Sequence, residues 1–198
     1  MDAYYYQKWI IIARRLTPEE DNLLKSCSKW LRDITVFALN TGMRQGEILS
    51  LRWRQVDLQR QEITVLITKN KEPRTLPIND AVLKLLKEKM KTHKESEYVF
   101  PSENGTMIGR NNLGRAFRKA VKDAGIVKFR FHDLRHTFAT RLVRLGTDLY
   151  KLAKLLGHKT LVMVTRYAHL DIESLRSDVE ALSTKHEKNA ALLLHQAA

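Results

Sequence analysis

Residues 61–78 read QEITVLITKNKEPRTLPI, and this stretch decides the fold class. Segments 61–70 and 74–78 are both rich in β-branched and other apolar residues, which favour strands. Between them the residues NKEP (70–73) have the composition of a turn. The stretch therefore predicts a β-hairpin.

The sequence on both sides of this hairpin has helical periodicity instead. In segment 29–41, for example, Trp30, Ile34 and Phe37 recur at intervals that place them on one face of a helix. The sequence thus predicts an α+β fold, a single compact and mostly α-helical domain with one small antiparallel β-sheet or hairpin. The expected helices are 18–28, 29–41, a short one from Arg44, 79–91, 111–124, 132–145, 148–156, 160–168 and 171–183.

The composition is that of a globular domain with excess positive charge. The 198 residues are 43% hydrophobic and 29% charged, and no apolar run is long enough to span a bilayer. The single cysteine, Cys27, excludes an internal disulfide, and with the lack of a secretory pattern it favours a cytoplasmic location and no membrane partner. The net charge of +13 attracts polyanions, of which nucleic acid is the commonest in a cytoplasm.

The segment FHDLRHTFAT (131–140) raises the question of a zinc site. His132 and His136 are four residues apart, as in the HExxH zinc motif. However, Asp133 is shorter than the glutamate that serves as base in that motif, and Arg135 would place a fixed cation beside the metal. We therefore disfavour a zinc hydrolase and interpret His136 as a packed helix residue.

A different set of residues fits the cleavage of a phosphodiester. Negative charge grows on the non-bridging oxygens in the transition state, and the planar, permanently charged guanidinium of arginine stabilises it. A nucleophile must also attack in line, and a proton must reach the departing oxygen. The candidates, in chain order, are Arg44, Lys69, His132, Arg135, His158 and Tyr167.

Four stretches that contain these residues resemble the signature stretches of the tyrosine recombinases, or phage integrases. They are TGMRQGEILSLRW (41–53), ITKNKEPRTLPI (67–78), FHDLRHTFAT (131–140) and LLGHKTLVMVTRYAHL (155–170). The spacings also resemble those of the family, with 25 residues from Arg44 to Lys69 and nine from His158 to Tyr167. The resemblance implies the tyrosine-recombinase catalytic fold over residues 14–183, a linker or residual N-terminal segment at 1–13, and a tail at 184–198 that docks on a neighbouring protomer.

The resemblance also implies a role for each candidate. Tyr167 would attack the scissile phosphate and form a 3′-phosphotyrosyl bond, releasing a 5′-hydroxyl. His132 would take the tyrosine proton as general base, and Lys69 would give a proton to the leaving 5′-oxygen.

The phosphate itself would be held by the remaining three residues. Arg44 and Arg135 would bind the non-bridging oxygens, and His158 would add a hydrogen bond to the same phosphate. Because arginines neutralise the charge and the phosphotyrosine conserves the bond energy, the reaction is expected to need no metal, no ATP and no other cofactor.

The implied function is site-specific DNA recombination by strand exchange, of integrase or excisionase type, for a phage or other mobile element in the bacterial cytoplasm or nucleoid. The implied partners are double-stranded DNA, a tetramer of the protein on that DNA, and accessory DNA-bending proteins. Two alternatives stay open: a type IB-like topoisomerase, and a DNA-binding fragment that is catalytically weak without an N-terminal clamp domain. Candidate contacts with the DNA backbone are Lys71, Arg74, Arg110, Arg115, Arg118 and Lys119.

Overall fold

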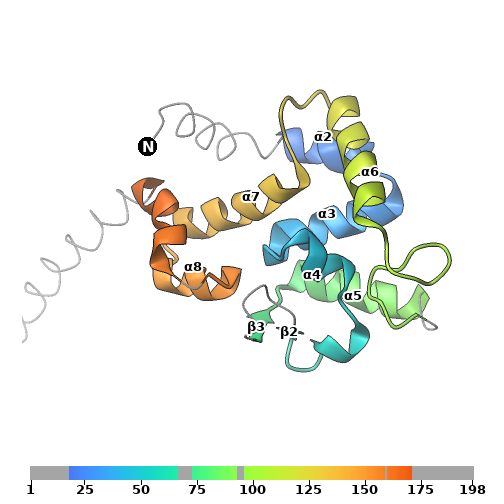
Figure 1. Ribbon diagram of the computed structural model, residues 1–198, viewed down its shortest axis with the longest axis horizontal. Coiled ribbons are helices and arrows are strands. Elements are labelled where there is room, and N and C mark those ends of the chain that lie inside the picture. Colours follow the sequence, from blue (N-terminus) through green and yellow to red (C-terminus); the bar gives the residue numbers. More distant parts are fainter. Residues whose placement is uncertain (1–17, 67–72, 93–95, 159, 171–198) are drawn as a thin grey trace, which may run out of the picture.

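The computed structural model describes residues 18–66, 73–92, 96–158 and 160–170 (Figure 1). Its α-helices are α2 (Pro18–Ser26), α3 (Lys29–Thr41), α4 (Gln45–Leu49), α5 (Asp80–Thr92), α6 (Arg110–Asp123), α7 (Phe131–Arg144) and α8 (Leu149–Leu156). Three short 3₁₀ segments are η1 (Trp53–Gln55), η2 (Leu161–Met163) and η3 (Thr165–Leu170). The helices expected between residues 18 and 156 are therefore confirmed.

Helix α3 is the centre of the fold. Its buried face carries Leu31, Ile34, Phe37 and Ala38, at the spacing of an amphipathic helix. Gly42 ends the helix with a φ of 60°, which glycine tolerates because it has no Cβ, and its N–H donates to the carbonyl of Ala38. The helix packs against α2, α4, α5, α6 and α7, so most of the chain is arranged around it (Figure 1).

The expected hairpin is present as two strands of a three-stranded antiparallel sheet. Strands β2 (Glu62–Val65) and β3 (Arg74–Pro77) pair with Ile63 opposite Leu76, and both side chains are buried. The third strand, β1 (Val56–Asp57), pairs with β2 and was not expected from the sequence. A run of two residues is too short to show the alternation by which strands are recognised.

The buried apolar side chains form two clusters. The main core extends from α2 to the start of α7 and includes Phe37 and Phe100, whose rings meet edge to face. Helix α7 joins the two clusters, because Leu134 belongs to the main core and Val143 to the other (Figure 1). The second group, called the small cluster below, consists of Ala139, Val143, Leu152, Ala153, Leu156, Val164 and Tyr167.

The segment 160–168 differs from the expectation of one helix. It contains the 3₁₀ segments η2 and η3, separated by Val164. Thr160, Val162 and Val164 are β-branched and lose side-chain freedom in an α-helix, which favours short, tight turns here. The expected helix 171–183 and the expected domain boundaries at 13/14 and 183/184 lie outside the described residues. Within the described ranges, no helix is long and apolar enough to cross a membrane.

Candidate active site

Helix α8 ends at the place where the candidate residues meet. The carboxylate of Asp148 caps its start by accepting from the N–H groups of Tyr150 and Lys151. Gly157 ends it with a φ of 63°, a left-handed conformation that favours glycine. The last carbonyls of a helix have no partners within the helix and carry the negative end of its dipole. They are therefore good acceptors for cationic donors.

Three consecutive carbonyls at this end, those of residues 155–157, each accept from a different arginine. Arg74 Nε donates to the first at 3.3 Å, Arg135 Nη2 to the second, and Arg44 Nη2 to the third at 3.3 Å. The arginines come from separate parts of the fold: β3, α7 and the residue that precedes α4. We refer to Arg44, Arg74 and Arg135 as the arginine cluster.

A single carboxylate, that of Glu47 in α4, neutralises part of this charge. Arg74 holds it with two hydrogen bonds, from Nη1 to Oε1 at 3.0 Å and from Nη2 to Oε2 at 2.7 Å. Arg44 binds the same oxygens, from Nη1 to Oε1 at 3.0 Å and from its backbone N–H to Oε2 at 2.8 Å. Burial alone would raise the pKa of Glu47, but the hydrogen bonds from Arg74 and Arg44 lower it below its ordinary value, so Glu47 is ionised.

Arg135 connects the arginine cluster to His158. The residue is 4% exposed, its Nη1 donates to the carbonyl of Gly42 at 2.7 Å, and its Nη2 lies 3.1 Å from His158 Nε2. Because a guanidinium can only donate, Nε2 accepts and a neutral His158 carries its proton on Nδ1. Burial, followed by repulsion from Arg44, lowers the pKa of Arg135 to about 9, so it is charged at neutral pH.

His158 is neutral at the same pH. Burial, and then the charges of Arg135 and Arg44, lower the pKa of its imidazole to about 4. Among the described residues, its buried Nδ1 has no hydrogen-bond partner. The ring therefore has one donor, on Nδ1, that no described residue accepts from.

Tyr167 lies in the small cluster with 3% of its surface exposed, and its hydroxyl is hydrogen-bonded to His136 Nδ1 at 2.7 Å. Burial raises the pKa of Tyr167 to about 12. Burial, together with the nearby His132 and Arg166, lowers the pKa of His136 to about 3. Both groups are therefore neutral in this arrangement. The exposed His132 meets His136 edge to face, with ring centroids 4.8 Å apart.

This arrangement combines concentrated positive charge with a phenol. Three guanidiniums against one carboxylate leave an excess of positive charge that attracts a phosphate, and arginine binds phosphate oxygens in pairs. A tyrosine can act as a nucleophile when a neighbouring base or a positive site makes its deprotonation easier. The site can therefore hold a phosphodiester near a nucleophile.

A family model described as the phage integrase family matches residues 14–174. The chain belongs to this family. Among the curated relatives, the integrase of Salmonella phage P22 is 34% identical over 169 residues, which cover 79% of this chain and 44% of that integrase. The chain spans about half the length of the curated relatives that it matches.

Solved structures confirm the tyrosine-recombinase catalytic fold for this integrase-family chain. The crystal structure of XerA recombinase has a TM-score of 0.67 and 28% identity, covering 85% of this chain and 61% of that one. The Tn1549 transposon integrase in complex with circular intermediate DNA has a TM-score of 0.72 and 25% identity, covering 84% of this chain and 66% of that one. These matches do not favour the topoisomerase alternative.

Five of the six catalytic candidates fall in the described part of the family fold. They surround the end of α8 or the neighbouring tyrosine: Arg44, His132, Arg135, His158 and Tyr167. The sixth, Lys69, lies outside the described residues, as does Lys71. The sequence reasoning missed Glu47, although a carboxylate three residues after an arginine at a helix start was a signal that could have identified it. It also missed the contact of His136 with Tyr167, for which helical spacing offers no signal.

Arg74 does not lie where the sequence analysis expected it. As a candidate contact with the DNA backbone it should be on the surface, but its side chain is only 10% exposed. Its guanidinium is already bound to Glu47 and to the carbonyl of Leu155. Residues two apart in a strand lie on the same face of the sheet. Arg74 therefore shares the inward face of β3 with the buried Leu76.

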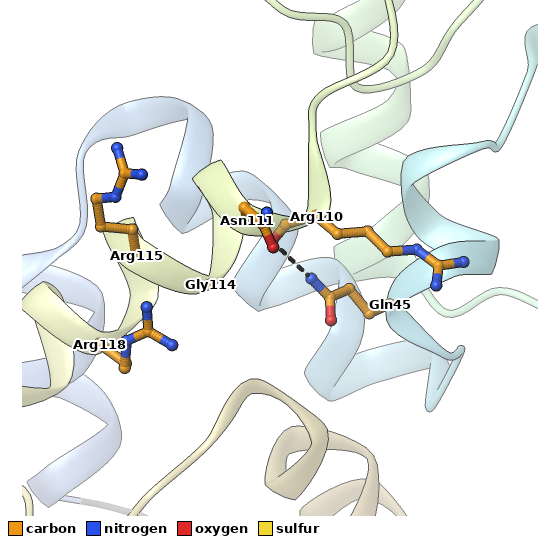
Figure 2. Close-up of a pocket in the computed structure, with 6 residues that line it drawn as sticks. All are labelled: Gln45, Arg110, Asn111, Gly114, Arg115 and Arg118. Carbon is orange, nitrogen blue, oxygen red and sulfur yellow. Dashed lines mark hydrogen bonds between the residues drawn. The ribbon is translucent and has the colours of Figure 1, made fainter.

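The remaining candidates for DNA contact, Arg110, Arg115, Arg118 and Lys119, are exposed on α6. Three of them border an open groove of about 400 Å³, called the α6 groove below (Figure 2). Gln45 Nε2 donates to the carbonyl of Arg110 at 3.3 Å, so the groove adjoins the start of α4, which directly follows Arg44. The groove is lined by Gln45, Arg110, Asn111, Gly114, Arg115 and Arg118.

Proposed function

We propose that this domain is the catalytic part of a site-specific DNA recombinase that cleaves and rejoins duplex DNA through a 3′-phosphotyrosyl bond at Tyr167. One observation carries the proposal: the end of α8 gathers Arg44, Arg135 and His158 into one positively charged site. Membership of the phage integrase family supports the same reaction class.

The scissile phosphate would bind at the arginine cluster. The side chain of Arg44 is 31% exposed, so its donors can turn to a non-bridging oxygen of the phosphate. Arg135 is held in place by hydrogen bonds to two carbonyls, those of Gly42 and Leu156. His158 would add a further hydrogen bond to the phosphate, which requires its buried Nδ1 to become accessible when DNA binds. Loss of one such transition-state donor typically costs about 2.7–4 kcal/mol, or roughly 10²–10³ in rate.

The reaction balances without an external reagent. The bond from phosphorus to the Tyr167 oxygen forms as the bond to the 5′-oxygen breaks, so the number of phosphodiester bonds is unchanged. The tyrosine proton is taken up by a base, and Lys69 protonates the departing 5′-oxygen. Attack by the 5′-hydroxyl of another strand then rejoins the DNA. Because arginines supply the positive charge and no bond energy is lost, neither a metal ion nor ATP takes part.

His132 is the base that we propose for the attacking tyrosine. His136 is the partner of Tyr167 in the described state, but a pKa near 3 makes it too weak a base to keep a proton at neutral pH. His132 is exposed, and its ring packs edge to face against the ring of His136. Tyr167 must therefore leave its buried contact with His136 before it attacks.

DNA would approach across the α6 groove towards the arginine cluster. Exposed arginines on α6 can neutralise backbone phosphates, which makes the affinity strongly dependent on salt. We further propose a tetramer on two duplexes, helped by accessory DNA-bending proteins, in the bacterial cytoplasm. The tail 184–198, which we propose to dock on a neighbouring protomer, lies outside the described residues. Unchanged assembly and activity after deletion of residues 190–198 would contradict its docking.

The test is a nicked duplex that carries the attachment site of the element and traps the covalent intermediate. A denaturation-resistant protein–DNA adduct is expected with the unchanged protein and with Tyr150→Phe, a matched control at an exposed tyrosine of α8. The adduct is expected to be absent with Tyr167→Phe. An adduct that persists in Tyr167→Phe would refute the nucleophile. Measurable binding without any adduct would instead support the DNA-binding fragment, and relaxation of supercoils by a monomer would support the topoisomerase.

A further inference from the structure

We propose that Arg74 is a positioning residue of the active site, which orients Arg44 through Glu47 and fixes the end of α8 that carries His158. The inference rests on the proposed function, because that function assigns Arg44 and His158 to the scissile phosphate. Arg74 itself does not touch the DNA.

The first argument is that all three nitrogens of the Arg74 guanidinium already donate hydrogen bonds. Nη1 and Nη2 bind the two oxygens of Glu47 at 3.0 and 2.7 Å, and Nε donates to the carbonyl of Leu155 at 3.3 Å. The side chains of Arg74 and Glu47 are 10% and 6% exposed. Because Arg74 is already neutralised by the carboxylate of Glu47, a phosphate would have to displace that carboxylate to bind it, whereas Arg135 is held by neutral carbonyls.

The second argument concerns the carboxylate that Arg74 and Arg44 share. Oε1 of Glu47 accepts from both arginines at 3.0 Å. The two parallel hydrogen bonds from Arg74 fix the plane of the carboxylate, since a guanidinium matches it in only one orientation. The direction in which Oε1 points then fixes the guanidinium of Arg44. Without Arg74 the carboxylate keeps only its two hydrogen bonds from Arg44 itself, so the alignment of Arg44 is no longer tied to β3.

The third argument concerns the backbone before His158. Besides binding the carbonyl of Leu155, Arg74 lies directly over Gly157, where an added Cβ would be 2.8 Å from Nη1. The same arginine thus contacts α4 through Glu47 and the end of α8 through its backbone. Together with the bond from Arg44 to the carbonyl of Gly157, Arg74 therefore helps to set the distance between the two groups proposed to bind the phosphate.

The test separates binding from catalysis. Single-turnover adduct formation is measured on the nicked duplex at saturating DNA, and the Kd for the intact duplex is measured separately. In Arg74→Ala we expect the saturating rate to fall about 10–100-fold, less than for a direct donor, with the Kd within about threefold of the original. Arg74→Lys keeps the charge but not the paired hydrogen bonds, so its rate is expected to stay at least about tenfold low. This variant carries the test if Arg74→Ala does not fold.

The matched control is a buried ion pair outside the site. Lys89 on α5 is also 10% exposed and binds Asp33 on α3 at 2.8 Å. Lys89→Met is expected to lower the unfolding free energy but to leave the saturating rate unchanged. An equal loss of rate in Lys89→Met and Arg74→Ala would show that the effect is only loss of stability, and would overturn the inference.

A measurement that does not depend on catalysis tests the inference separately from the proposed function. In the DNA-free protein, the side-chain N–H signals of Arg44 are followed by NMR and are expected to broaden or to move to the position of solvent-exposed arginines in Arg74→Ala. An adduct that forms at the original rate in Arg74→Ala overturns the inference and leaves the proposed function standing. A large rise in Kd with an unchanged rate overturns it as well. If the unchanged protein forms no adduct, the proposed function fails, and unchanged Arg44 signals in Arg74→Ala would then overturn the inference independently.

Discussion

The main core and the small cluster are held in place by different forces. The main core consists of buried apolar side chains from most of the elements that surround α3. Each of these side chains is therefore covered by several elements. The small cluster has seven buried members among the described residues, taken from α7, α8 and the segment around Tyr167. The end of α8 is also attached to the rest of the domain by the apolar contact of Leu155 with the main core and by the hydrogen bonds from the arginine cluster to the carbonyls of residues 155–157.

The candidate active site lies where these two regions meet. The members of the arginine cluster belong to elements that also line the main core, whereas their carbonyl acceptors belong to α8. Regions with few buried apolar contacts open at lower free energy than the core of a domain. We therefore expect the region around Tyr167 to open before the main core does, which suits a nucleophile that must leave a buried contact.

The largest effect is expected in the main core. Phe37 is fully buried in α3 and packs edge to face on Phe100, with ring centroids 5.0 Å apart. Phe37→Ala is expected to lower the unfolding free energy by about 3–5 kcal/mol, because it removes the ring and leaves a cavity that closes only in part. Urea denaturation measures the change. A loss below about 1 kcal/mol would mean that the main core is not the better packed of the two regions.

A smaller and more local effect is expected in the small cluster. Leu152 is fully buried there on α8. Leu152→Ala is expected to cost about 2–3 kcal/mol, at the low end for such a change, because a cluster this small can relax. Hydrogen exchange should become faster in α8 while α3 keeps its protection. Equal acceleration in both helices would contradict a separate opening of the small cluster.

Acid is expected to destabilise the small cluster and the end of α8 before it destabilises the main core. His136 and His158 have pKa values of about 3 and about 4 in the folded protein, both below the ordinary value near 6.5. Below pH 6.5 the unfolded chain therefore binds more protons, so the unfolding free energy falls as the pH decreases towards 4. Each histidine contributes up to about 1.4 kcal/mol per pH unit.

Urea denaturation at pH 7.5, 6 and 5 checks the acid effect, with His158→Gln as the variant that removes one of the two groups. Its slope against pH should be smaller than that of the unchanged protein. Hydrogen exchange at pH 5 should show faster opening in α8 than in α3. A stability that does not change between pH 7.5 and 5 would show that the two histidines are not buried as neutral groups.

The smallest expected effect is that of Tyr167→Phe on stability. The substitution keeps the buried ring and, among the described residues, removes the hydrogen bond to His136, so it should cost about 1 kcal/mol. Thermal unfolding without DNA measures this cost. A stability equal to that of the unchanged protein would mean that the hydrogen bond to His136 does not stabilise the folded state. Breaking it would then cost Tyr167 nothing when it leaves its buried position.

The sequence predicted the helices because their signals are local. Segment 29–41 carries its apolar face and its terminating glycine within one stretch, and helix α3 has the same bounds. The hairpin was also predictable, since the composition changes abruptly at residue 61. Strand β1 and the 3₁₀ segments near Tyr167 were not, because two or three residues are too few to establish a period.

The candidate site was predictable in its members but not in their contacts. Four signature stretches identified Arg44, Arg135, His158 and Tyr167, whereas nothing in the order of residues indicates that Arg74 turns inward to a carboxylate 27 positions earlier. Contacts of this kind depend on how β3 packs against α8, which is a property of the whole fold. Composition correctly suggested that α6 carries exposed arginines, but could not place them around a groove beside α4.

The carbonyls at the end of α8 also affect which sequence changes the domain can tolerate. A point substitution at Leu155 or Leu156 replaces a side chain and leaves the oxygen that accepts from the arginine in place, whereas at Gly157 the left-handed backbone and the contact with Arg74 oppose any side chain. Three of the hydrogen bonds that align the site are thus accepted by backbone oxygens, which replacement of a side chain does not remove. Insertion or deletion of one residue in α8 is different, because it turns the helix end by about 100° and shifts it by about 1.5 Å. This region should therefore keep its length over evolutionary time, even at positions where the side chain changes.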